Sequence, residues 1–353
     1  MNEKTIIDAD EPILVTGAAG FIGHKVIASL ATRGFRAIRC FVRPSSNVAR
    51  LADVINTFGN VAKIDLIAGN LLSQEDCEAA AKDIAVVYHV AAGTGTKSFP
   101  DAFMNSVVTT RNLLDAVVRQ ACLKRFVNVS SFAVYTNRGK PHRNLLDESC
   151  PVEDRPALRH DAYCFAKIKQ DEIVCHYRKN HGLPYVMIRP GVVYGPGRTG
   201  IPGRVGLDTF GIFLHLGGSN KVPLTYVDNC ADAIVLAGLA DGVEGEVFNI
   251  VDDDLPASRE ILRLYKRNVR PVRSIYVPKI AGYVFHYVWE RYCAWSQEQL
   301  PPVYNRKVWH AYWKKTEYTN AKAKSLLGWK PGISTAEGLR RYFRSCREVR
   351  LDA

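Results

Sequence analysis

The 353-residue sequence predicts an α/β protein built on a doubly wound parallel sheet, followed by a smaller and mostly helical region. Two observations predict this fold class. Over the first 190 residues, short runs rich in branched apolar residues alternate with longer helical patterns, and strands that alternate with helices pair in parallel through right-handed crossovers. In addition, a glycine-rich turn stands between the first such run and the first helical pattern.

The expected elements follow one another along the chain. Strands are expected at 12–16, 37–42, 63–67, 86–90, 125–131 and 184–190, and helices at 21–33, 76–82, 102–120 and 162–180. Gly and Pro interrupt the alternation between residues 191 and 202. We therefore expect a first domain over 1–190, to which strands and helices from about 225–250 return, and a second region over 191–353.

The glycine-rich turn reads LVTGAAGFIGHKV and places Gly17, Gly20 and Gly23 between a strand and a helix. Such a turn presents free backbone N–H groups and the positive end of the helix dipole to a pyrophosphate. We therefore predict that residues 1–190 form a Rossmann-type domain that binds NAD or NADP. The second strand runs into Arg43 and two serines, whereas an acidic residue is typical of NAD sites, so the sequence favours NADP and leaves NAD open.

A second motif, DAYCFAKIKQDE, places Tyr163 and Lys167 four residues apart and hence on one face of a helix. Tyr ordinarily titrates near pH ~10, and a neighbouring ammonium favours the phenolate that general-base chemistry on an alcohol requires. Upstream, Ser131 ends an expected strand, at the sheet edge where α/β proteins hold their ligands. Ser131, Tyr163 and Lys167 are therefore the candidate catalytic residues.

These motifs occur together with GNL at 69–71, YHVAA at 88–92, RPGVVYGPG at 189–197, YVDNCADA at 226–233 and LLGWKP at 326–331. In this combination the chain resembles the extended short-chain dehydrogenase/reductase family, which comprises NAD(P)-dependent epimerases, dehydratases and 3β-hydroxysteroid-dehydrogenase-like enzymes. The resemblance implies that Ser131 binds the substrate oxygen and that Tyr163 exchanges its proton. It also implies that Lys167 holds the nicotinamide ribose and keeps Tyr163 acidic.

The resemblance further implies a cofactor site and an oligomeric state. Together with Arg43, the expected cofactor-binding residues are Gly17, Ala19, Gly20, Phe21, Ile22, Gly23, Asn70, Leu71, Ala91, Ala92, Tyr163, Lys167, Pro190 and Val193. A homodimer through the helix that bears Tyr163 is expected as well. One position departs from the family pattern: Ser106 stands where Asn is usual, with Asn105 one place early, which puts the supporting role of that Asn in doubt.

The residue two places after the candidate serine narrows the reaction. Similar enzymes that dehydrate or decarboxylate nucleotide sugars carry an acidic residue there, and this sequence has Ala133, so elimination is disfavoured. Reversible hydride transfer at a secondary alcohol or ketone, with or without epimerisation, is favoured. Lys221 stands where nucleotide-sugar members carry an Arg, and we expect it to meet a substrate diphosphate if one is bound. The last third is more similar to the sterol-dehydrogenase-like branch. We therefore expect an oxidoreductase of a bulky substrate, and the alternatives are a UDP-hexose 4-epimerase and a non-catalytic NADP-sensing or scaffold protein.

The formal charge of +12 is concentrated in the C-terminal part of the chain. Residues 255–353 carry 20 Lys and Arg against 7 Asp and Glu, together with all five Trp, whereas the rest is close to neutral. Because the charge lies on the expected substrate side, nucleic acid is not an expected partner. We interpret the aromatic helix expected over 280–295 as a lid, with peripheral membrane contact as the alternative.

The remaining features exclude several classes of protein. The nine cysteines lack the spacing of a disulfide framework or a metal site. No run approaches the ~20 apolar residues of a membrane-spanning helix, and the N-terminus lacks the pattern of a secretory signal. We therefore expect a cytoplasmic protein with reduced thiols and no bound metal, acting on a small molecule.

Overall fold

The structure, a computed structural model, describes residues 5–93, 98–139, 144–297 and 299–351. Its centre is a seven-stranded parallel sheet in the order β12-β7-β5-β4-β1-β2-β3. The strands are β1 (Ile13–Thr16), β2 (Ala37–Val42), β3 (Lys63–Ala68), β4 (Val86–His89), β5 (Arg125–Val129), β7 (Tyr185–Pro190) and β12 (Val247–Ile250). The predicted strands are confirmed, and their ends differ from the sequence-based boundaries by at most two residues.

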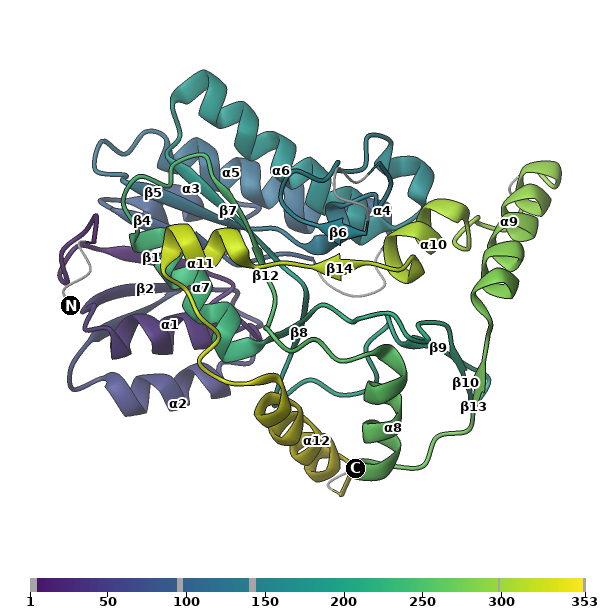
Figure 1. Ribbon diagram of the computed structural model, residues 1–353. Helices are drawn as coiled ribbons and strands as arrows, with labels where there is room; N and C mark the ends of the chain where they lie inside the picture. Colours follow the sequence, from purple (N-terminus) through teal and green to yellow (C-terminus); the bar gives the residue numbers. More distant parts are fainter. Residues whose placement is uncertain (1–4, 94–97, 140–143, 298, 352–353) are drawn as a thin grey trace.

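Helices cover both faces of this sheet (Figure 1). One layer consists of α1 (Gly23–Thr32), α2 (Ala49–Phe58), α7 (Val227–Leu239) and α11 (Ala321–Leu327), and the other of α3 (Gln74–Ala81), α5 (Thr109–Val117) and α6 (Ala162–His181). Each layer buries its own apolar cluster against the strands, in which nearly every side chain is inaccessible to solvent. This arrangement confirms the doubly wound α/β fold.

The C-terminal region combines helices with short strands. Its helices are α8 (Ser258–Asn268), α9 (Lys279–Trp295), α10 (Arg306–Trp313) and α12 (Thr335–Leu351). Its strands are β8 (Val192–Tyr194), β9 (Gly206–Thr209), β10 (Ile212–His215), β11 (Leu224–Tyr226), β13 (Ser274–Tyr276) and β14 (Glu317–Tyr318), the last of which pairs with β6 (Leu145–Leu146). Segments beyond residue 190 thus return to the first domain, since β12 pairs with β7 and β14 pairs with β6. The division of the chain into two domains at residue 190 stays a prediction.

The helix expected over 102–120 is interrupted. It consists of α4 (Phe99–Phe103), a π-helical turn (Met104–Val108) and α5, because the chain contains one residue more than a regular α-helix would accommodate there. The π-turn buries Ser106, whose hydroxyl accepts a hydrogen bond from the Gly93 backbone N–H at 3.0 Å, whereas the amide of Asn105 bonds back to Asp101 on its own helix. Ser106 rather than Asn105 therefore bonds to the segment after β4, in line with its place in the sequence.

Candidate active site

The three candidate catalytic residues lie together at the carboxyl end of β5. Ser131 follows this strand, and its hydroxyl bonds to the phenol of Tyr163, which stands in the first turn of α6. The Asp161 side chain caps α6 by accepting the N–H of Cys164 at 3.0 Å, which fixes the start of the helix and hence the place of Tyr163. One turn further on, the ammonium of Lys167 donates to the Val129 carbonyl at 2.6 Å.

The glycine-rich turn forms a narrow backbone cradle at the N-terminus of α1. A Cβ on Gly23 would lie 2.1 Å from the Gly17 carbonyl oxygen, and one on Gly17 would lie 2.8 Å from the backbone nitrogen of Ala91. Gly17 also has a φ of +69°, which residues with a side chain rarely adopt. Only glycine therefore allows this close packing, and the resulting turn leads directly into the N-terminus of α1, where the positive end of the helix dipole suits a pyrophosphate.

The other residues expected to bind the cofactor lie on this edge of the sheet. They follow the carboxyl ends of four parallel strands or stand in the turn itself: Ala19, Gly20, Phe21 and Ile22 after β1, Arg43 after β2, Asn70 and Leu71 after β3, and Ala91 and Ala92 after β4. Pro190 ends β7, and Val193 lies in β8 directly beyond it. The Arg43 side chain is exposed. This row of strand ends and the glycine cradle fit an extended dinucleotide.

A cavity of about 690 Å³ opens beside Ser131 and Tyr163. Its floor is formed by the segment after β5 and by the start of α6, and its walls come from the C-terminal region. The wall residues include Leu207, Val303, Tyr304, Val308, Tyr312 and Trp313. Lys221 is not among the lining residues, because its ammonium donates to the Leu255 carbonyl at 2.8 Å on the protein surface. The cavity is therefore mainly apolar and aromatic.

Comparison with protein families identifies the fold's relatives. Residues 13–251 match the family model described as the NAD dependent epimerase/dehydratase family. The chain belongs to this family. Membership confirms the predicted resemblance and the predicted class of protein, a nicotinamide-dependent enzyme with oxidoreductase chemistry, and it is consistent with the glycine cradle and the Ser131, Tyr163 and Lys167 cluster.

Individual relatives differ in how much of the chain they match. A sterol-4-alpha-carboxylate 3-dehydrogenase, decarboxylating, of Candida albicans is 27% identical, and the match covers 93% of this chain and 95% of the relative. A putative anthocyanidin reductase of Ginkgo biloba is 28% identical, but the match covers only 53% of this chain and 57% of that protein. Among solved structures, UDP-glucuronic acid 4-epimerase of Bacillus cereus in complex with NAD superposes with a TM-score of 0.70 at 22% identity, covering 96% of this chain and 99% of that one, and shares the fold.

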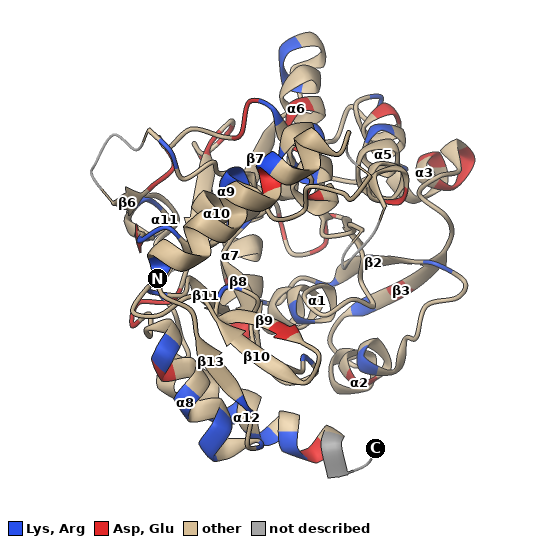
Figure 2. Ribbon diagram, turned by 90° about the vertical axis from the view of Figure 1, so that its right-hand side faces the viewer, with Lys and Arg blue, Asp and Glu red and all other residues tan. Residues whose placement is uncertain are grey.

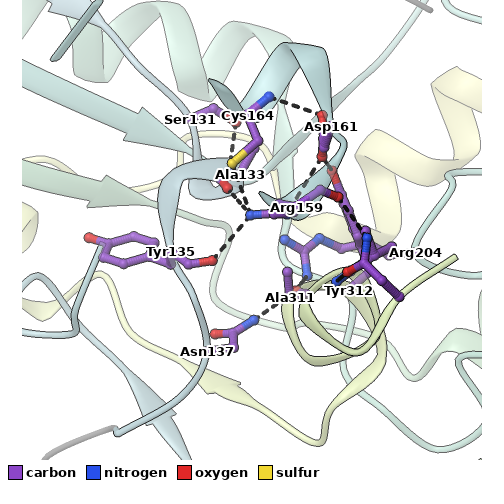
Figure 3. A network of polar contacts seen from close by, with 12 residues as sticks. Ser131, Ala133, Tyr135, Asn137, Arg159, Asp161, Cys164, Arg204, Ala311 and Tyr312 are labelled. Atoms are coloured by element: carbon purple, nitrogen blue, oxygen red, sulfur yellow. Dashed lines mark hydrogen bonds and ion pairs between the residues drawn. The ribbon is translucent and has the colours of Figure 1, made fainter. Parts of the chain in front are cut away.

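Two buried arginines of the site were not identified from the sequence of this family member (Figure 3). Arg159 is fully buried and donates to the Ala133 carbonyl at 2.6 Å, and its guanidinium lies 3.5 Å from the Asp161 carboxylate. It therefore ties the segment after Ser131 to the cap of α6. Arg204 lines the cavity, and the two guanidiniums each lie 5.1 Å from the centre of the Tyr312 ring.

Burial also changes the pKa values of Tyr163 and Lys167. Desolvation raises the pKa of Tyr163, and the hydrogen bond from Ser131 opposes that shift. Desolvation lowers the pKa of Lys167 to about 8, with the nearby Asp171 carboxylate opposing this change. Lys167 therefore carries its charge at neutral pH and loses it at a pH at which an exposed lysine is still an ammonium.

This lowered pKa predicts a pH dependence of cofactor binding. If the charged form of Lys167 holds the nicotinamide ribose, affinity is constant while the ammonium persists and falls as the pH rises through about 8. We expect the Kd for NAD(P)H to approach a rise of roughly tenfold per pH unit above that value. Fluorescence titration between pH 6 and 10 measures it, and Lys167→Met should give weak binding that no longer changes over this range.

Proposed function

We propose that the protein is an NAD(P)-dependent dehydrogenase or reductase that acts on a secondary alcohol or ketone of a bulky, largely apolar substrate. The observation that carries the proposal is the position of Ser131 and Tyr163 on the floor of a cavity with aromatic walls. The phenol and the hydroxyl can meet one polar atom of a substrate, while the walls bury its apolar body. The near full-length similarity to a sterol dehydrogenase supports this substrate class.

The chemistry follows from these positions. The bound nicotinamide supplies the acceptor or donor of the hydride. In the oxidising direction, Ser131 donates a hydrogen bond to the substrate oxygen, and Tyr163 accepts the hydroxyl proton at its phenolate oxygen while the C=O bond forms. In the reducing direction, Tyr163 returns this proton to the oxygen. Lys167 stabilises the phenolate through its positive charge and so lowers the free energy of the proton transfer.

A buried arginine in the cavity wall suggests that the substrate also carries an acidic group. Arg204 is 8% exposed and donates to the Ala311 carbonyl at 2.9 Å, and within the described part of the chain no carboxylate forms an ion pair with it. A buried cation without a counter-charge is costly. We propose that a carboxylate or phosphate of the substrate balances this charge, in the role that sequence analysis gave to Lys221.

Arg204→Met is therefore expected to weaken binding of an acidic substrate selectively. With a 3-hydroxysteroid 4-carboxylic acid as the probe, we expect KM to rise about 30-fold, the value of a charged hydrogen bond. The methyl ester of the same probe should show a change of less than about threefold, since it carries no charge to lose. Arg204→Lys should recover part of the affinity. Equal losses for acid and ester would contradict the assignment and point to a packing role beside Ala311.

The alternative is a nucleotide-sugar 4-epimerase, which the shared fold with UDP-glucuronic acid 4-epimerase keeps open. Epimerisation needs only the same proton and hydride transfers, performed twice. The position of Lys221 outside the cavity and the presence of Ala133 in its lining give a sugar diphosphate and an elimination step no dedicated group there. Incubation with UDP-hexoses in the absence of added cofactor distinguishes the two, because an epimerase needs no net oxidant or reductant.

The cofactor is proposed to be NADP rather than NAD. The exposed Arg43 and the serines after it support this preference, since they suit a 2′-phosphate better than a diol. Mass spectrometry of the nucleotide that co-purifies with the protein tests the preference and also reveals any retained substrate. NAD alone in the purified protein would overturn it.

We also propose an oligomeric state and a cellular compartment. The exposed side chains of Phe103 and Met104, of which Phe103 lies beside Phe165 of α6 at 6.4 Å between ring centres, support a homodimer through this helix. None of the nine cysteines, all of which lie in the described residues, forms a disulfide bond, which supports a reducing compartment, and hence the cytoplasm. Light scattering of the purified protein tests the first feature, and imaging of a tagged chain tests the second.

A further inference from the structure

Exposed apolar side chains gather in one segment. In the described part of the chain 22 large apolar side chains are exposed, and 12 of them lie between residues 275 and 303. Trp295 is 79% exposed and Ile280 78%, at opposite ends of α9, with tyrosines, valines and a phenylalanine between them. None of the described helices is both long and apolar enough to cross a bilayer. A surface this apolar on a folded domain marks a binding site.

The packing of α9 shows why its apolar residues remain exposed. The helix buries a single narrow stripe, formed by Gly282, His286 and Cys293. Through this stripe it lies on α10, where a Cβ on Gly282 would come within 2.5 Å of the Trp309 ring. Outside this stripe, Lys279, Trp289 and Glu290 are half-buried, and all other residues of the 17-residue helix are exposed. The interpretation of this helix as a lid accounts for the buried stripe but not for the opposite, apolar side.

A cluster of positive charge borders this segment. Four side chains of α8, Arg259, Arg263, Lys266 and Arg267, surround a surface hollow of about 500 Å³ together with His215. Residues 255–278 contain six Lys and Arg and one acidic residue, Glu260. Within the described residues, no carboxylate forms an ion pair with any of these four cations. Their charge is therefore available to a partner.

The basic hollow and the apolar helix belong to one continuous face, which we call the α8–α9 face. His215 lines the hollow, and its ring lies 5.6 Å from that of Tyr276 in β13, the strand that leads into α9. The tip of the β9–β10 hairpin adds Phe210, which is fully exposed, and β13 adds Ile275. Figure 2 shows α8, the β9–β10–β13 sheet and α9 on the side turned to the viewer, with Lys and Arg on α8 and α12.

We propose that the α8–α9 face docks the protein on the surface of an anionic phospholipid bilayer. Exposed Trp and Tyr are the side chains that prefer the boundary between lipid headgroups and acyl chains. Lys and Arg beside them are attracted to acidic headgroups. The hollow of α8 has the charge to receive a headgroup phosphate. A second copy of this chain is the less suitable occupant, because a two-fold interface would bring two identical basic clusters together.

The cavity lies next to the α8–α9 face, so docking would bring the substrate site close to the bilayer. This part of the inference rests on the proposed function. Val303 and Tyr304 line the cavity, and Val303 is 41% exposed within the apolar segment. The Tyr304 ring contacts those of Phe285 and Trp289 in α9, at 5.6 and 5.8 Å between centres. One wall of the cavity thus packs directly against α9, which belongs to the α8–α9 face. An apolar substrate can pass from the bilayer into the cavity without crossing water.

Co-sedimentation of the full-length chain with vesicles tests the docking without relying on activity. The probes are vesicles of phosphatidylcholine alone and vesicles with about a third phosphatidylserine, at ~0.1 M salt. We expect binding to the acidic vesicles and little to the neutral ones. Arg263→Gln with Arg267→Gln should lower the partition coefficient about 30-fold, and Ile280→Ser with Trp295→Ser should lower it at least about tenfold.

Matched variants control for loss of charge and of apolar surface elsewhere. Lys82→Gln with Lys179→Gln removes two exposed charges, and Val61→Ser with Leu66→Ser removes two exposed apolar side chains, all of them far from α8 and α9 along the chain. These variants should sediment as the unmodified protein does. Equal binding to both kinds of vesicle, absence of binding to either, or self-association that the Ile280 and Trp295 changes abolish would each overturn membrane docking, and the last would assign the face to a second copy. Because the assay contains no substrate, its result does not depend on whether the proposed reaction is correct.

Discussion

Tyr163→Phe is expected to abolish turnover while leaving the cofactor bound. The substitution removes one oxygen, the atom that exchanges the substrate proton, and general acid–base catalysis typically contributes 10²–10⁴-fold. We therefore expect kcat to fall about 10³-fold or more, with the Kd for NAD(P)H changing less than about threefold. Because the phenol of Tyr163 lines the cavity and bonds to Ser131, loss of its hydroxyl should change the free energy of unfolding by only about 1 kcal/mol.

The cavity provides the matched control for this experiment. Tyr304 lines the same cavity, and its described contacts are with the rings of α9 rather than with Ser131. Tyr304→Phe should therefore retain most of the activity of the unmodified enzyme. If Tyr163→Phe were fully active as well, Tyr163 would not be the proton carrier and the proposed chemistry would be wrong. Inactivity of both variants would instead indicate a general sensitivity of the cavity.

Gly23→Ala is expected to eliminate cofactor binding. The new methyl group would lie 2.1 Å from the Gly17 carbonyl oxygen, and because this oxygen belongs to the backbone, the turn itself must move. Overpacking of this kind costs about 1–3 kcal/mol of stability. The displaced N–H groups no longer meet a pyrophosphate, and we expect NAD(P)H affinity to drop at least about 100-fold, the value of two or more charge-assisted hydrogen bonds.

Gly332→Ala is the control for the glycine experiment. No heavy atom lies within 4 Å of a Cβ placed on Gly332, and this glycine has no positive φ, so the methyl group meets open space. Calorimetric titration with NADPH and thermal unfolding of both variants separate loss of binding from loss of fold. A folded Gly23→Ala protein that binds the cofactor normally would show that the cradle is not the pyrophosphate site.

The parts of the site that could be predicted are those encoded by local sequence. The glycine turn is recognisable because a strand, three glycines and a helix follow one another directly, and each is fixed by its own backbone requirement. Tyr163 and Lys167 are likewise one helical turn apart, so their common face follows from spacing alone. The strand ends could be placed because buried parallel strands consist of continuous apolar runs.

The parts that could not be predicted depend on contacts between distant segments. Arg204 reaches the cavity because it donates to Ala311, more than 100 residues away in α10. Arg159 ends a short 3₁₀ helix (Pro156–Arg159), and nothing in the neighbouring sequence distinguishes it from a surface arginine. Two further parts of the fold were not predicted: α2, a helix of 10 residues that buries only Leu51 and Val54, and the β9–β10–β13 sheet, whose strands have only three or four residues each.

The π-helical turn between α4 and α5 has a consequence for how the protein tolerates change. One extra residue in a helix rotates everything beyond it by about 100°, and the π-turn absorbs this rotation within residues 104–108. The side of α5 that packs on the sheet therefore keeps its position even if α4 rotates. The Phe99 ring of α4 packs on Phe165 of α6. A change in the orientation of α4 can therefore be absorbed in this turn before it reaches the core beneath α5.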